Sequence, residues 1–505
     1  MFGLIKKELK KQEDYSITEN GAIGYKSTDS ALVNINYKVS SLRQSEEDEI
    51  INLFDKAFYE HKEYALKWLF FARDIREGLG ERRLFRVCYK RLVELDINAF
   101  YQNLNNIPEY GRWDDLVSLS GISDITDEYI VNIIQNQLGK DLNNYEHKKP
   151  ISLLAKWLPS ENASATNTKK LAKKIRRLLG MTPRKYRLML SKLRAYSNVV
   201  EVKMCNNEWD KIDYEKVPSL ANLKYKNAFM EHDGRRRTQY LKSVAQGTNK
   251  MNMKVATPVD VVARYTENSY LSSSIGSLDE TLELAWKNLK DVIVEDTLVV
   301  ADGSGSMTIP VSGRIRALDV ANALAIYTSE HNSGIYKNQY ITFSSRPQFV
   351  EFKETDTLRE KLLTATKHNE CSNTDIEKVF NLILGVAIEN NIPQEEMIKN
   401  ILIISDMEFD RAQTCWGSDS LLTKPLFKTI EERYNNAGYK LPKLIFWNVN
   451  SRTGTIPLLE NELGVALVSG FSQNVLKMVM SGKLNPYEVL VETITNPRYD
   501  SIKIS

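Results

Sequence analysis

The sequence predicts two kinds of domain in one chain, an α-helical domain followed by an α/β domain, which together form an α + α/β fold. Apolar residues recur every three to four positions over most of residues 41–290, with few strand signals. Over residues 291–485, short apolar runs alternate with helical stretches. The charge divides in the same way: residues 1–290 carry 47 Lys and Arg against 38 Asp and Glu, whereas residues 291–505 carry 21 against 27. A chain of 505 residues is long enough for two or three domains.

The C-terminal part alternates between strand and helix. The runs "DTLVVAD", "QYITF", "QFVEF", "KNILIIS", "PKLIFWN" and "GVALVSGF" are typical of strands, and the segments "GRIRALDVANALAIYTSEHN" and "NTDIEKVFNLILGVAIEN" are typical of helices. This order predicts a doubly wound, mainly parallel sheet. In such sheets the ligand crevice lies at the carboxyl ends of the strands.

Oxygen-bearing side chains gather at these strand ends. Asp302, Ser304 and Ser306 follow the first strand at a spacing of two, and Asp406 follows another strand. Thr374 precedes a helix, where a loop could bring it to the same edge, and the alternative is that it is a helix N-cap. Two carboxylates and three hydroxyls suit Mg²⁺, or another divalent cation such as Mn²⁺ or Ca²⁺. We expect a metal site that leaves one position open for a carboxylate from a protein partner.

Other readings of the same turn fit less well. A phosphate-binding Walker loop needs a Gly-Lys-Ser/Thr ending, and a hydrolase elbow needs GxSxG, whereas the order here is Gly303-Ser304-Gly305-Ser306. None of the five histidines pairs convincingly with a nucleophile, so we expect no enzyme and no catalytic residue. Glu408 and Asp410 could add charge at the metal site or be ordinary surface acids.

The N-terminal part is predicted to be a helical repeat domain of the HEAT-like kind. Its helical pattern is clear, but no fixed sequence period supports the repeat directly. The segment "RDIREGLGERR", residues 73–83, has two readings. Gly78 and Gly80 could leave backbone amides free to bind an anion near the start of a helix, or the segment could simply link two helices through salt bridges. The segment "IPEYGRWDDL" is expected to be architectural. Helical stretches are predicted over residues 46–100 and around 125–140, 150–158, 168–180, 183–196 and 219–247.

A basic segment within this part predicts nucleic-acid binding. Residues 162–200 contain no Asp or Glu, and eleven Lys and Arg lie between Lys169 and Arg194. We expect this face to contact the phosphates of small or single-stranded RNA, with Tyr186 and Tyr196 able to stack bases. A solvated helix face and a membrane-surface helix are the alternatives. The predicted RNA-binding residues are Lys169, Lys170, Lys173, Lys174, Arg176, Arg177, Arg184, Lys185, Arg187, Lys192, Arg194, Arg235, Arg236 and Arg237.

Composition indicates an intracellular, cytoplasmic protein. The chain is 42% hydrophobic and 26% charged, which is typical of soluble globular proteins. No apolar run is long enough to span a membrane, and the N-terminus lacks the apolar core of a secretory signal. The four cysteines show no metal-type spacing, which favours a reducing compartment. We therefore expect no membrane partner.

Sequence motifs of the chain resemble those of two known families. Asp302-x-Ser304-x-Ser306, with Thr374 and Asp406 downstream, resembles the metal-ion-dependent adhesion site (MIDAS) of von Willebrand factor A domains, which have a Rossmann-like fold. The blocks "ARDIREGLGERRLF", "IPEYGRWDDL", "LAKWLPSENAS", "VADGSGSM", "ISDMEFD" and "IFWNVN" resemble the uncharacterised domain-of-unknown-function 2828 family, from about residue 40 to about residue 485.

The order of domains in that family is similar to the Ro autoantigen, in which a TROVE module of helical repeats is closed by a von Willebrand A domain. This likeness implies a non-catalytic RNA-binding scaffold, a ribonucleoprotein component with a Mg²⁺-dependent docking site. The alternative is a metal-dependent protein-interaction module with no RNA role. The predicted boundaries are an extension (1–40), the helical domain (41–290), the von Willebrand A-like domain (291–485) and a tail (486–505) that could pack on the helical domain.

Overall fold

The computed structural model divides into two compact units. It describes residues 13–197, 199–266, 275–343, 346–369, 373–411, 424–479, 483 and 485–504. The first unit combines residues 1–65 with 256–496, and the second combines residues 66–255 with 497–505. Among the described residues, no helix is both long and apolar enough to cross a membrane.

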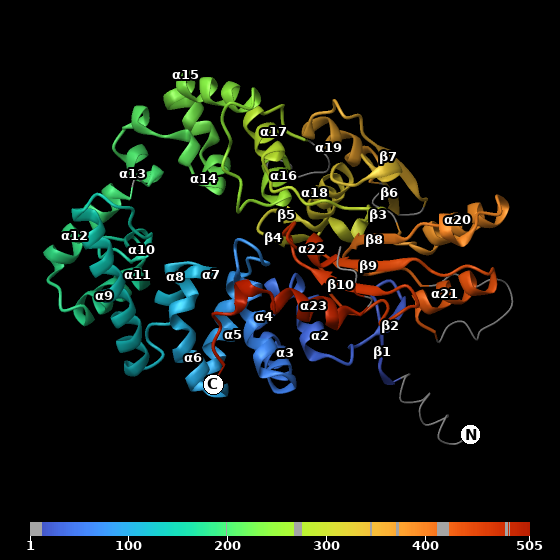
Figure 1. The fold of residues 1–505 in the computed structure, drawn as a ribbon, viewed down its shortest axis with the longest axis horizontal. Coiled ribbons are helices and arrows are strands. Elements are labelled where there is room, and N and C mark those ends of the chain that lie inside the picture. The colour runs from blue at the N-terminus through green and yellow to red at the C-terminus, as the bar shows by residue number, and fades with distance from the viewer. Residues whose placement is uncertain are drawn as a thin grey trace. The chain divides into compact units, whose positions relative to one another are not determined.

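The first unit is built on a six-stranded sheet, which confirms the α/β prediction. The strand order is β10-β9-β8-β3-β6-β7, and every pairing is parallel except that of β6 with β7 (Figure 1). Nearly all central strand residues are buried, as expected for a sheet covered on both faces. The strands are β3 (Thr297–Asp302), β6 (Gln339–Phe343), β7 (Gln348–Glu351), β8 (Asn400–Ser405), β9 (Lys443–Asn448) and β10 (Val465–Ser469).

Helices flank this sheet. The central one, α18 (Ala317–Glu330), packs against β3, β6 and β8, and all its residues but the last are buried because its sequence is apolar on every side. Asp319 closes its first turn by accepting hydrogen bonds from both the amide and the guanidinium of Arg316. The other helices are α16 (Pro258–Thr266), α17 (Glu280–Lys287), α19 (Leu358–Lys367), α20 (Glu377–Glu389), α21 (Leu426–Asn436), α22 (Val475–Val479) and α23 (Pro486–Ile494).

The N-terminal segment also belongs to the sheet unit, which corrects the predicted boundary at residue 41. A hairpin of β1 (Tyr15–Ile17) and β2 (Ile23–Tyr25) is followed by α2 (Ala31–Tyr37) and α3 (Glu47–Glu60). Helix α2 packs on β10 and α23, and Asn448 donates a buried hydrogen bond to the Tyr37 carbonyl at 2.8 Å. The boundary could not be predicted because helical periodicity shows which face of a helix is apolar, but not which hydrophobic core that face packs into.

The second unit is helical, as predicted. The buried Arg73, at the end of α4, donates two hydrogen bonds to the buried Asp115 at 2.9 and 2.7 Å. Arg86 binds the other oxygen of Asp115 at 2.7 Å. The helices are α4 (Lys62–Arg73), α5 (Arg82–Leu95), α6 (Ile97–Asn103), α7 (Ile107–Tyr110), α8 (Trp113–Val117), α9 (Asp124–Glu146), α10 (Leu154–Trp157), α11 (Thr166–Leu178), α12 (Pro183–Tyr196), α13 (Val200–Cys205), α14 (Ser219–Lys224) and α15 (Lys226–Ala245).

The end of the chain packs into this helical unit. Arg498 forms an ion pair with the buried Asp74, and the Tyr499 hydroxyl donates to the same carboxylate at 3.2 Å. Asn103 binds the backbone of Lys503 through both its side-chain oxygen and its nitrogen, at 2.8 Å each. The predicted tail is thus divided, because α23 lies on the sheet unit and only residues 497–505 lie here.

Candidate functional site

The predicted metal residues begin at two neighbouring strand ends. Asp302 is the last residue of β3, and Asp406 directly follows Ser405, the last residue of β8. These strands pair in parallel, so their carboxyl ends lie at the same edge of the sheet. The Ser405 hydroxyl donates to one Asp302 oxygen at 2.6 Å, which ties the two strand ends together. Both carboxylates are buried, with exposed fractions of 1% or less.

The two serines close the turn after β3. The Ser304 amide donates to the second oxygen of Asp302 at 2.9 Å, and the hydroxyls of Ser304 and Ser306 lie 3.0 Å apart. Ser306 also hydrogen-bonds Asp406. The DGSGS segment therefore directs two hydroxyls and one carboxylate to the place where the Asp406 carboxylate lies.

Thr374 reaches this edge from a loop. Its backbone exchanges hydrogen bonds with Asp410, whose carboxylate accepts from the Thr374 amide at 3.0 Å and whose amide donates to the Thr374 carbonyl at 3.0 Å. Its side chain is not a helix cap, because Ile376 occupies the N-cap of α20. The Thr374 hydroxyl instead accepts from the Asn20 amide group at 2.9 Å. The N-cap alternative for Thr374 is therefore wrong.

The electrostatics of this group suit a hard cation. Burial, with repulsion from Asp406, raises the pKa of Asp302 to about 7, and burial also raises the pKa of Asp406. Two buried carboxylates, with the hydroxyls of Ser304 and Ser306 beside them, are a donor set that a divalent cation would stabilise, whereas the Thr374 hydroxyl contacts Asn20. Over the described ranges, no group of three or more His, Cys, Asp and Glu has a metal-binding arrangement.

Glu408 is not an exposed acid at the edge of the sheet. It is fully buried, and one of its oxygens accepts from the amides of Arg452 and Thr453 at 2.8 and 2.9 Å. The other oxygen accepts from the Glu19 amide at 2.9 Å. The interpretation of Glu408 as a surface acid is therefore wrong, whereas its charge does act at the site, since it helps to raise the pKa of Asp406. Its carboxylate joins the backbone at Glu19 to the backbone at Arg452 and Thr453.

Sequence reasoning missed four residues at this site. The Arg452 guanidinium donates to Asp406 at 3.0 Å and pairs with Glu19 at 2.7 Å, so it lies between a predicted ligand and the N-terminal hairpin. Asn20 and Ser405 contact Thr374 and Asp302 as described above. The sequence signal for Arg452 is its position in "NSRTGT", just after the strand "KLIFWN", because loops at that end of a strand meet the ligand crevice.

The basic segment forms α11 and α12, which both pack on α9. Helix α11 buries Ala172 and Ile175 and directs a row of Lys169, Lys173 and Arg177 outward at intervals of four. Helix α12 buries Tyr186, Leu190 and Leu193, which corrects the expectation that Tyr186 stacks bases. We define the basic face as the exposed members of the predicted set on these helices: Lys169, Lys170, Lys173, Arg177, Arg184, Lys185, Arg187 and Lys192.

Other predicted RNA contacts serve the fold instead. Lys174 pairs with Asp127, and Arg176 pairs with Glu161 at 2.8 Å. Arg194 donates to the carbonyls of Ala155 and Leu158, and burial lowers the pKa of its guanidinium.

The second basic cluster divides in the same way. Arg236 binds Asp233 and two carbonyls, and Arg237 is fully buried between three aromatic rings with a hydrogen bond to Asn222. Of the cluster at 235–237, Arg235 alone is exposed. Arg237 therefore cannot contact RNA, and Arg236 is already engaged.

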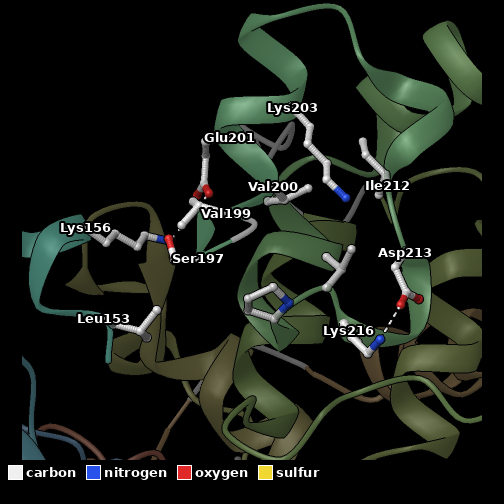
Figure 2. A pocket seen from close by; sticks show the side chains of 12 residues that line it. Leu153, Lys156, Ser197, Val199, Val200, Glu201, Lys203, Ile212, Asp213 and Lys216 are labelled. Carbon is white, nitrogen blue, oxygen red and sulfur yellow. Dashed lines mark hydrogen bonds and ion pairs between the residues drawn. The ribbon is translucent and has the colours of Figure 1, made fainter. Parts of the chain in front are cut away.

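A cavity of about 200 Å³ lies beside the carboxyl end of α12 (Figure 2). Ser197, which directly follows α12, forms part of its wall, and three lysines surround it (Figure 2). Two of them are paired with acids, Lys156 with Glu201 at 3.4 Å and Lys216 with Asp213 at 2.8 Å. The remaining lining is mainly apolar: Leu153, Val199, Val200, Ile212, Val217 and Pro218.

Comparisons with known proteins place the chain in a family of unknown function. The family model described as Domain of unknown function (DUF2828) matches residues 18–120 and 128–297. A second model, Domain of unknown function (DUF7788), matches residues 296–497, so the expected single match to about residue 485 is divided between two models. An uncharacterized protein of Acanthamoeba polyphaga mimivirus is 32% identical, over 95% of this chain and 87% of the viral protein.

Among solved structures, the chain is similar to the crystal structure of the RO (RSR) protein of Deinococcus radiodurans. The match covers 90% of this chain and 92% of that one, with 14% identity and a TM-score of 0.34. These values are too low to support an inference about function.

Proposed function

Because the chain belongs to the DUF2828 family, whose function is unknown, we propose its function from its own surfaces. It is a non-catalytic RNA-binding scaffold, and its α/β unit carries a Mg²⁺-dependent docking site. The observation that carries the RNA proposal is the basic face, eight exposed lysines and arginines on α11 and α12 in a segment without a single acid.

A polyanion is the partner that such a face would attract. Lys169, Lys173 and Arg177 form a row along α11, and rows of this kind neutralise successive phosphates and release their counterions. The cavity next to Ser197 has a volume of about 200 Å³ and a mainly apolar lining with lysines around it, so in this proposal it takes one base of a strand bound on α12. Measuring RNA affinity of the full chain at increasing salt tests the proposal. A steep fall with salt supports it, and undetectable or salt-independent binding contradicts it.

The metal proposal assigns the ion to Asp302, Ser304, Ser306, Thr374 and Asp406. The ion would neutralise the two buried carboxylates and supply a positive charge to which an anionic oxygen can dock. The side chains of this protein would hold and orient that ion. Ser405 would support them by fixing one Asp302 oxygen, and Asp410 by fixing the backbone of Thr374.

Replacing Ser304 and Ser306 together with alanine is expected to lower Mg²⁺ affinity by at least about tenfold, because two oxygen donors are lost. Isothermal titration calorimetry of the full chain measures this. The matched control is Ser312→Ala, which removes an exposed hydroxyl from β4 (Pro310–Ser312) in the same unit. Equal affinities for the double variant and this control would remove the serines from the site.

A further inference from the structure

The turn of the N-terminal hairpin lies on the candidate metal site. The Thr18 hydroxyl donates to the Phe409 carbonyl at 2.7 Å, and the Glu19 amide donates to Glu408 at 2.9 Å. The Asn20 amide group donates to the Thr374 hydroxyl at 2.9 Å and to the Glu408 carbonyl at 2.6 Å. One of the predicted ligands is therefore already in contact with this hairpin.

The hairpin is also fixed along its strands. Tyr25 exchanges backbone hydrogen bonds with Ile456 at 2.8 Å in each direction, and the hydroxyls of Ser16 and Thr455 lie 2.9 Å apart. Gly24 lies so close to the neighbouring segment that a Cβ atom there would be 2.5 Å from the Ile456 carbonyl oxygen. Even alanine at this position would push the hairpin away from residues 455 and 456.

Charge links the hairpin to the carboxylates of the site. Arg452 contacts Asp406 at 3.0 Å on one side and Glu19 at 2.7 Å on the other. Unpaired, a guanidinium next to Asp406 would repel a divalent cation. Glu19 compensates that positive charge and so favours the cation, although its side chain is 48% exposed and solvent weakens the effect.

From this arrangement we infer that the docking partner of the metal site is the chain's own N-terminal hairpin, which Asn20 joins to Thr374 and Glu19 joins, through Arg452, to Asp406. The inference rests on the metal site proposed above and names its partner. Cation binding and hairpin docking then stabilise each other, because linkage between two sites is reciprocal. A protein partner with a free carboxylate, the earlier expectation for this site, would have to displace the hairpin.

Hydrogen exchange of the full-length protein tests this inference. Adding Mg²⁺ is expected to slow exchange of the amides in residues 15–25 by about fivefold or more, and Gly24→Ala is expected to abolish that protection. In calorimetry, Glu19→Gln is expected to weaken Mg²⁺ binding by about fivefold. The matched control is Glu13→Gln, which neutralises an exposed acid in the same segment and leaves both values unchanged.

The two proposals fail in different ways. If Mg²⁺ binds but leaves the exchange of residues 15–25 unchanged, and Glu19→Gln binds it as the wild type does, the metal site stands and the hairpin is not its partner. If the wild type binds no Mg²⁺, the metal site itself is contradicted and the hairpin inference falls with it. Should Gly24→Ala disturb folding, the Glu19→Gln result decides alone.

Discussion

Charge reversal of Lys169, Lys173 and Arg177 to glutamate is expected to weaken single-stranded RNA binding by about a hundredfold or more at physiological salt. All three side chains are exposed and form one row on α11. Each phosphate contact with a single strand contributes about 0.7 to the slope of log affinity against log salt, so losing three should lower the slope by about 2. Fluorescence anisotropy at several salt concentrations measures both quantities.

The matched control reverses three exposed lysines elsewhere, Lys90, Lys250 and Lys254, and so changes net charge by the same amount. It should lower affinity only slightly and leave most of the salt slope intact. Equal losses in the two triple variants would mean that total charge, and not the basic face, governs binding. Lys174 and Arg176 are left unchanged because their ion pairs belong to the fold.

Asp115→Ala is expected to destabilise the helical unit by about 3–5 kcal/mol. Asp115 is buried and accepts hydrogen bonds from Arg73, Arg86 and the Arg112 amide. Its removal leaves the buried Arg73 guanidinium without its partner, which costs far more than losing an exposed pair. Urea unfolding followed by the helical circular dichroism signal measures the change.

Asp114→Ala is the control for this prediction. Asp114 is the neighbouring residue and pairs with Arg82 and Arg86, but those pairs are partly exposed and should contribute about 1 kcal/mol or less. A loss of stability for Asp115→Ala no larger than that for Asp114→Ala would show that the buried pair does not hold the helices together. Two arginines of the segment "RDIREGLGERR", Arg73 and Arg82, pair with Asp115 and Asp114. These ion pairs favour the interpretation of that segment as a salt-bridged link between two helices over its interpretation as an anion-binding site.

The α/β fold, and the meeting of Asp302 and Asp406 at one edge of its sheet, could be predicted from sequence because their signals are local. Asp302 and Asp406 each end an apolar run, and parallel topology brings such ends together whatever the intervening loops do. The alternating DGSGS spacing places its hydroxyls beside the first carboxylate. The helical pattern located α11 and α12 closely for the same reason, since an apolar stripe and a basic stripe are both visible in the chain.

The partners of individual charges could not be predicted, because they depend on contacts between distant segments. Lys174 and Lys173 are neighbours in one basic run, yet Lys174 meets Asp127 of α9 and Lys173 faces solvent. Arg237 belongs to an "RRR" triplet that suggests a surface, but it is buried. The ion pairs of Arg452 with Glu19 and Asp406 join segments that are far apart in the sequence, so no local sequence pattern predicts them.

The most direct test of the central claim is ultraviolet crosslinking in cells, followed by stringent purification of the full-length protein and sequencing of the attached RNA. The wild type, the triple variant of the basic face and the Lys90/Lys250/Lys254 control are compared. We expect a defined RNA population on the wild type and the control that is lost from the variant. RNA no higher than background on the wild type, or equal recovery from all three proteins, would contradict an RNA-binding role for the basic face.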